Sequence, residues 1–384
     1  MRKVSDETVS SLKNFQDVSF DIASSVGTTA KQIQNSTADF MRLGESLEEA
    51  AKSAEVANIL LNVSEFEDID DATESLVSMS AAYNELDKID IVDKLNLIGN
   101  NFAISTDGLA TALQNSASAL KTAQNDIDES IALATAANAV VQDPDKVGAG
   151  LRTIALRITG TEAAKEELAS LGEDVDDFVV ATASKLNDQV KALTKTAGKN
   201  GVSLLDDNGN YRSTYEILQD IADIWEQIAQ EDLATGQNRQ NALLEMLAGK
   251  NRSNILASIL QSPETLRDAY ESSLNDSAGS AQEELNKYLD SIEGKIAKFQ
   301  NEAQEFWHNL ISSETVKNVI DAGTTIMDIL GKVADVLGEI GTLGAIAGTS
   351  LSIYLSKNSG GRDKKFSLII KYATESFSRE VCEF

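Results

Sequence analysis

The sequence predicts an all-α protein, and its prolines and composition are the first evidence. Pro144 and Pro263 are its only prolines, and each follows a residue that can cap a helix, Asp143 and Ser262. Proline is tolerated at the first helical position, because the N–H that it lacks would have no partner there. Aromatic residues make up only 5% of the chain, which is low for a β-sandwich and normal for helices packed through Leu, Ile and Ala.

Helix start signals and helical spacing are the second observation, and they are clearest in residues 92–160. Start signals stand at Ser105-Thr106, at the capping box from Asp126 to Glu129, and at Asp143-Pro144, while Gly160 can end the last helix. Apolar residues recur three or four positions apart after each signal: Leu109, Leu113, Ala117 and Leu120; Ile127, Ile131, Ala134 and Val141; Val147, Leu151, Ile154, Ala155 and Ile158. We therefore expect three short helices in a compact unit.

The helical pattern lapses over residues 202–212. An Asn208-Gly209 pair lies between short apolar pieces, which favours a small β-hairpin or a turn. The Asp/Asn cluster also invites a calcium hypothesis. Counted from Asp206, however, an EF-hand loop requires Gly and Glu where this chain has Tyr211 and Ile217. A polar turn is the better interpretation.

The third observation is a heptad seam, with apolar residues alternately four and three positions apart. It consists of Leu285, Leu289, Ile292, Ile296, Phe299, Ala303, Phe306 and Leu310. On one helix this seam would span about 38 Å. Because such a stripe needs a partner helix, the seam predicts coiled-coil self-association. A similar series follows over residues 316–340.

Residues 340–356 form an uncharged segment with three glycines. The segment is slightly shorter than the roughly 18 apolar residues that usually indicate a membrane span. Its small residues would also permit close packing inside a helical bundle. Two interpretations stay open: a buried helix, or the inserting element of a membrane-perturbing helical protein.

Charge and residue inventory limit the chemistry of the chain. The formal net charge is −28, and an acidic surface repels phosphate backbones, so direct nucleic-acid binding is not expected. With His308 and Cys382 as the only histidine and cysteine, an intrachain disulfide and the usual Cys/His zinc sites are excluded. No nucleophile–base pair stands out. We expect no catalytic, cofactor-binding or metal-binding residues, and no enzymatic activity.

An ordered set of phrases carries a family resemblance over roughly residues 32–310. The phrases are IQNSTADFMRLGESLEEAA, IGNNFAISTDGLATALQNSASALK, DESIALATAANAVVQDP, VGAGLRTIALRITG, STYEILQDIADIW, LLEMLAGKNRSNILASIL and SAGSAQEELNKYLDSIEGKI. In this order they resemble the core region of phage tail tape-measure proteins. The resemblance implies a structural, prophage-encoded protein that sets tail length and templates assembly of the tail tube. It also implies tube subunits and assembly chaperones as partners, synthesis in the host cytoplasm, and a final place in the virion tail.

The expected organisation has five parts. An N-terminal polar helix or remnant (1–35) precedes the helical tape-measure core (36–275) and the coiled-coil-like helices (276–338). The apolar glycine-containing segment (339–356) and an atypical C-terminal tail (357–384) follow. The resemblance lapses in the tail, where a tape-measure protein is expected to continue as a long helical rod. We therefore expect a truncated or fragmentary member.

Overall fold

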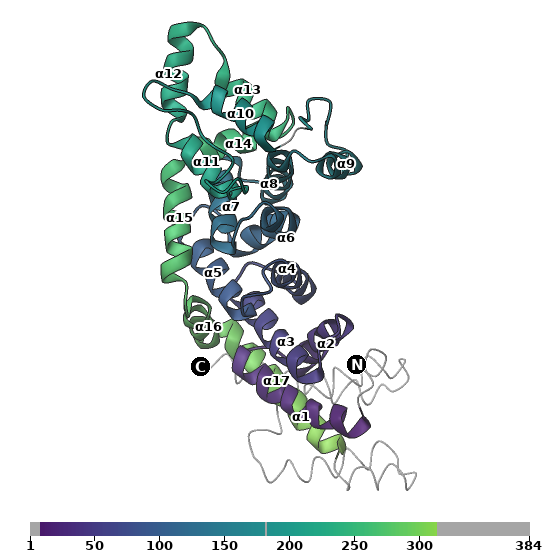
Figure 1. Cartoon of the computed structure of the whole chain (residues 1–384). Helices are drawn as coiled ribbons and strands as arrows, with labels where there is room; N and C mark the ends of the chain where they lie inside the picture. Colours follow the sequence, from purple (N-terminus) through teal and green to yellow (C-terminus); the bar gives the residue numbers. More distant parts are fainter. Residues whose placement is uncertain (1–7, 181–182, 313–384) are drawn as a thin grey trace, which may run out of the picture. The chain divides into compact units, whose positions relative to one another are not determined.

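The computed structural model describes residues 8–180 and 183–312, and these residues form an all-α structure, as predicted (Figure 1). Its helices are, in chain order, α1 (Val9–Val26), α2 (Ala30–Arg42), α3 (Leu47–Asn62), α4 (Ile69–Ala82), α5 (Lys88–Asn101), α6 (Thr106–Thr122), α7 (Ile127–Val141), α8 (Pro144–Thr159), α9 (Glu162–Ser170), α10 (Ala183–Thr194), α11 (Thr214–Ala222), α12 (Trp225–Thr235), α13 (Arg239–Ala248), α14 (Ser253–Leu260), α15 (Pro263–Asp276), α16 (Ser280–Asp290) and α17 (Ile292–Ser312).

The chain divides into two compact units, Met1–Lys298 and Phe299–Phe384. The first unit contains α1 to α16 and the beginning of α17. The division falls within α17.

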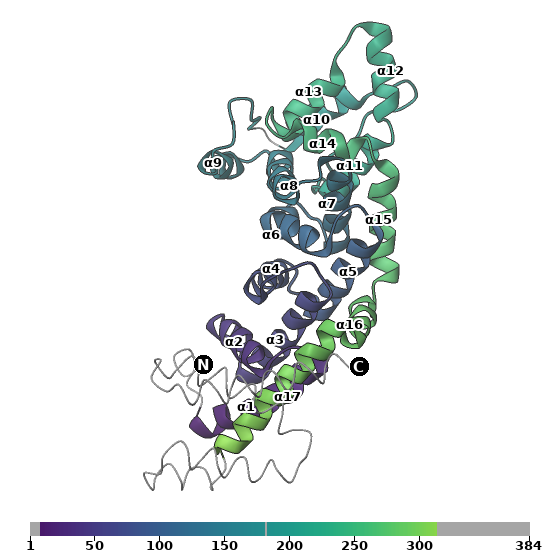
Figure 2. The same cartoon turned by 180° about the vertical axis from the view of Figure 1, so that it is seen from behind.

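The first unit is built from two rows of helices. One row consists of α2, α4, α6 and α8, and the other of α3, α5, α7 and α14, with consecutive members of each row in contact. Figures 1 and 2 show α4, α6 and α8 as successive members of the first row. Two later helices pack on the second row: α15 contacts α5 and α7, and α16 contacts α3 and α5. Segments far apart in the sequence therefore complete one core.

The predicted start signals act as helix caps. In the Asp126 box, the Asp126 carboxylate accepts from the Glu129 N–H at 2.8 Å and the Glu129 carboxylate accepts from the Asp126 N–H at 2.9 Å. Asp143 caps α8 with Pro144 in its first turn, and Gly160 ends it at a φ of 62°. A left-handed residue at this position satisfies free carbonyl groups without steric cost when it is glycine. These helix bounds are therefore set by local sequence.

The predicted apolar faces of α6, α7 and α8 form the centre of the core. Residues such as Leu113, Ile131 and Leu151 are completely buried. Gly148 of α8 lets this helix approach α6 closely, because a Cβ atom there would lie only 2.5 Å from the carbonyl oxygen of Ala112. The expected compact unit of short helices is present.

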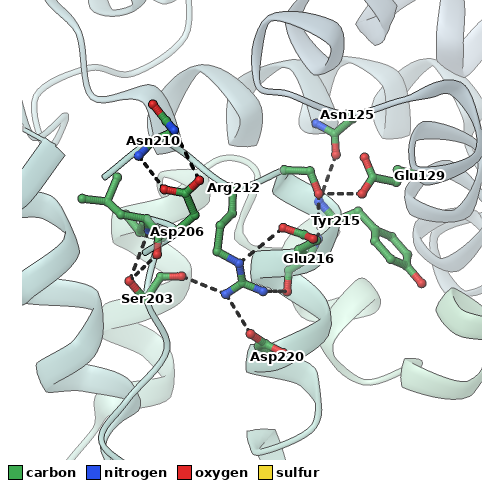
Figure 3. Close-up of polar contacts among 12 residues, drawn as sticks. Asn125, Glu129, Ser203, Asp206, Asn210, Arg212, Tyr215, Glu216 and Asp220 are labelled. Carbon is green, nitrogen blue, oxygen red and sulfur yellow. Dashed lines mark hydrogen bonds and ion pairs between the residues drawn. The ribbon is translucent and has the colours of Figure 1, made fainter. Parts of the chain in front are cut away.

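Residues 202–212 form a turn with a single antiparallel bridge, between Leu205 and Tyr211. The Asp206 carboxylate accepts from the backbone N–H groups of Asn208 and Asn210 at 2.9 and 2.8 Å. Arg212 then reaches the carboxylates of Glu216 and Asp220 on α11 (Figure 3). The Asp206 carboxylate is thus engaged within its own loop, as expected for a polar turn.

The seam over residues 285–310 does not lie on one helix, so the expectation of a continuous 38 Å helix is wrong. Helix α16 ends at Asp290, and Ser291 is extended, with φ −69° and ψ 170°. The Ser291 hydroxyl accepts from the Gly294 N–H at 3.1 Å, as an N-cap residue does. A local cap therefore interrupts the heptad pattern. The second predicted series, over 316–340, lies outside the described residues.

Within the described part of the chain, no helix is both long and apolar enough to cross a membrane. The uncharged segment 340–356, for which membrane insertion was one interpretation, lies outside the described residues, as does the tail 357–384.

Candidate functional site

The structure separates the eight predicted seam residues. Leu285 is buried and Leu289 packs against the core from α16. Helix α17 carries the other six, which are Ile292, Ile296, Phe299, Ala303, Phe306 and Leu310. Of these, Ile292, Ile296 and Phe299 are 73%, 52% and 43% exposed. The structure does not describe the side chains of Ala303, Phe306 and Leu310. Self-association through this seam stays a prediction.

A buried polar site on α5 was missed by sequence reasoning. Asp93, Lys94 and Asn96 are buried there between apolar neighbours. Because a buried charge is costly unless it is paired, each of these side chains needs a specific partner. Three polar residues among the apolar residues Ile91, Val92, Leu95 and Ile98 were the available signal. Their partners lie 34 to 188 positions away in the sequence, so no local pattern identifies them.

Lys94 joins three helices. Its ammonium group donates to Asp128 Oδ1 on α7 at 2.7 Å and to the Ser273 carbonyl oxygen on α15 at 3.0 Å. The Ser273 hydroxyl donates to the same Asp128 oxygen at 2.5 Å. The Lys94 and Asp128 side chains are only 11% and 9% exposed. This closed triangle holds α15 against α5 and α7.

Asp93 holds the start of α16 against α5. Its two carboxylate oxygens accept from the backbone N–H groups of Gly279 and Ala281 at 2.8 and 2.9 Å. Asn96, one turn further along α5, donates to the Ser280 hydroxyl at 2.7 Å. A carboxylate at a helix start satisfies free N–H groups and interacts favourably with the helix dipole. Helix α5 thereby caps α16 from a distant part of the chain.

Glu129 of α7 fixes the start of α11. It closes the predicted capping box with Asp126, and it accepts a second bond from the Ser213 hydroxyl at 2.7 Å. Ser213 in turn caps α11 through the Glu216 N–H at 3.1 Å. The Tyr215 N–H donates to Asn125 Oδ1 at 2.9 Å (Figure 3). Two capped helix starts are therefore bonded to each other.

Partial burial raises the pKa of Glu129 to about 6, although the bonds from Ser213 and from the Asp126 backbone oppose this rise. Burial favours the neutral form of a carboxyl group because it removes the water that would solvate the charge. Glu129 consequently binds its proton more tightly in the folded chain than in the unfolded chain. Its contribution to stability is complete below pH 4.5 and is lost as the pH rises through about 6.

We expect Glu129→Gln to be more stable than the wild type at pH 7 by about 1 kcal/mol, a value reduced for the partial exposure of the side chain. At about pH 3.5 the two proteins should be equally stable, because Glu129 is then largely protonated in both the folded and the unfolded state. Urea unfolding at about pH 7, 6 and 3.5 measures the difference. A constant difference over this range would contradict the assignment.

Arg157 of α8 holds a nonhelical segment. Its guanidinium group donates to the Asp174 carbonyl oxygen and to Asp177 Oδ1, both at 2.8 Å, and lies 5.5 Å from the centre of the Phe178 ring. The Arg157 side chain is 2% exposed. The buried Arg157 therefore fastens the Asp174–Phe178 part of segment 171–178, while Arg252 holds Glu173 of the same segment through two bonds at 2.9 and 2.5 Å.

These polar groups connect one helix to another. Asp93, Asp128 and Glu129 are all engaged as hydrogen-bond acceptors that join one helix to another. Over residues 8–180 and 183–312, no three His, Cys, Asp or Glu side chains are grouped so that they could hold a metal ion. The site therefore fixes segments that are far apart in the sequence against one another.

Stacked helices and structural carboxylates define a helical scaffold protein. Residues 16–249 match the family described as phage-related minor tail protein. The chain belongs to this family, which gives it a structural role in a phage tail. No solved structure matches the chain. Helices α15 and α16, which Asp93 and Lys94 hold, follow the matched segment.

Proposed function

We propose that the protein is a tail tape measure, which sets tail length and templates assembly of the tail tube. Membership of the minor tail protein family, with a match over residues 16–249, is the observation that carries this proposal. The ordered phrases over residues 32–310 support the finer assignment, because they resemble the core of tape-measure proteins. The role requires helices and surfaces for partners, and no catalytic centre.

The proposed organisation follows the sequence. Residues 36–275 would form the helical tape-measure core. The helices over 276–338 would supply the coiled-coil contacts between copies. Tail tube subunits and assembly chaperones would be the other partners. The protein would be made from a prophage in the host cytoplasm and would end in the virion tail. The buried bonds at Asp93 and Lys94 support this scheme, because they fix α15 and α16 to the core.

Tail length is the quantity that tests the proposal. In particles released after prophage induction, deletion of residues 313–340 should shorten the tail by about 42 Å, the length that 28 residues span in the helix predicted there from the apolar spacing. The matched control keeps the 28 residues and their heptad spacing but changes their order, and it should leave tail length unchanged. Electron microscopy gives the length, and mass spectrometry shows whether the chain is in the particle.

The outcomes separate the family role from the measuring role. Tails of unchanged length that contain the deleted protein would contradict the tape-measure function and leave a different structural role. If mass spectrometry of wild-type particles finds tails without any peptide of this chain, the result would contradict a place for the protein in the virion.

A further inference from the structure

The corner between α16 and α17 is held by a small set of local bonds. The Ser291 N–H donates to the Tyr288 carbonyl oxygen at 2.9 Å, which ends α16. The Ser291 hydroxyl and carbonyl oxygens accept from the N–H groups of Gly294 and Lys295 at 3.1 and 3.2 Å, which begins α17. Ser291 is thus the C-cap residue of α16 and the N-cap residue of α17.

The apolar register continues through this corner although the helix does not. Leu285, Leu289, Ile292 and Ile296 are spaced four, three and four residues apart, so on one continuous helix they would share a stripe. In the structure Leu285 is 1% exposed and Leu289 packs against the core, whereas Ile292 and Ile296 are 73% and 52% exposed. The corner therefore leaves Ile292 and Ile296 exposed to solvent, whereas Leu285 and Leu289 contact the core.

Gly294 is what permits the corner. A Cβ atom at this position would overlap the Tyr288 carbonyl oxygen and would lie 2.9 Å from Leu289 Cα. These are backbone atoms of α16, so they cannot move aside as a flexible side chain could. In a continuous α-helix, residues six apart are separated by a rise of about 9 Å, and this overlap disappears. Alanine at 294 is therefore compatible with a continuous helix and incompatible with the corner.

We propose that Ser291–Gly294 is a two-state hinge. In one state α16 and α17 meet at the corner; in the other they form one helix, with Ile292 and Ile296 on the same side as Leu285 and Leu289. Recovery of helical hydrogen bonds favours the continuous state. The Ser291 cap and the poor helix propensity of glycine favour the corner. The hinge does not depend on the tape-measure function.

The test measures a distance across the hinge. Spin labels at Gln282 and Lys298, both exposed, are attached in the full chain with Cys382→Ser as background. In a continuous helix the labelled Cα atoms would be about 24 Å apart, and the corner makes this distance shorter. Pulsed electron spin resonance should give mainly the short distance for the wild type. Gly294→Ala should convert at least half of the molecules to the distance near 24 Å.

Two variants at the cap act by a different route. Ser291→Ala removes the hydroxyl acceptor and should shift the distance in the same direction as Gly294→Ala. Ser291→Asp keeps an acceptor for the Gly294 N–H and should retain the short distance. Circular dichroism confirms that each variant is folded. A short distance unchanged in both Gly294→Ala and Ser291→Ala would overturn the hinge, as would equal shifts in Ser291→Ala and Ser291→Asp.

Discussion

Replacing Asp128 with alanine is expected to lower the free energy of unfolding by about 3–5 kcal/mol, because the change leaves the Lys94 ammonium group buried without its counter-charge. The Lys94 and Asp128 side chains are only 11% and 9% exposed, so water can compensate little of the loss. The Ser273 hydroxyl would lose its acceptor as well. Urea unfolding followed by circular dichroism measures the effect.

A double variant distinguishes a lost charge partner from simple loss of packing. In Lys94→Met/Asp128→Leu both charges are absent, so most of the stability lost in Asp128→Ala should return. The matched surface control is Lys52→Ala, which breaks a pair whose side chains are 71% and 82% exposed, and it should change stability by less than about 0.5 kcal/mol. If the double variant were as unstable as Asp128→Ala, the buried-charge explanation would fail.

Arg157→Ala should have the second large effect, a loss of about 3 kcal/mol or more. The change leaves Asp177 without its cation and opens a cavity beneath segment 171–178, whose backbone Arg157 also holds through Asp174. Because this segment is nonhelical, proteolytic cleavage within it should become faster than in the wild type. Urea unfolding and limited proteolysis measure the two effects.

Arg267→Ala is the control for Arg157, because it breaks an arginine–aspartate pair that is 46% and 43% exposed. Its effect on stability should be small, and cleavage in segment 171–178 should stay at the wild-type rate. Equal effects of the two substitutions would show that Arg157 does not hold the segment.

The helices could be predicted because their signals are local. The capping box at Asp126 and the Asp143-Pro144 start place helix ends where the structure has them. The α16–α17 corner was not predicted, because the heptad spacing runs on through it. Ser291 followed by Gly294 was the local signal, since serine caps a helix and the glycine leaves room for the preceding turn.

The candidate site could not be predicted because its bonds join distant parts of the sequence. Asp128 and Glu129 were recognised as parts of a helix start, which they are, but their partners Lys94 and Ser213 come from other helices. Asp93 carries no local sign that it caps a helix 186 residues away. Periodicity indicates which face of a helix is buried, and it does not indicate which polar groups meet there.

The long reach of Asp93 and Lys94 has a consequence for synthesis of the protein. Their bonds to Ser273, Gly279 and Ala281 close loops of 179 to 188 residues, so they cannot form until the ribosome has released that late part of the chain. Until then the nascent core carries polar groups on α5 without their final partners, and pairing over such separations is slow. A fragment that ends at Gly249 would stay in this unfinished state, although it contains the whole segment by which the family is recognised.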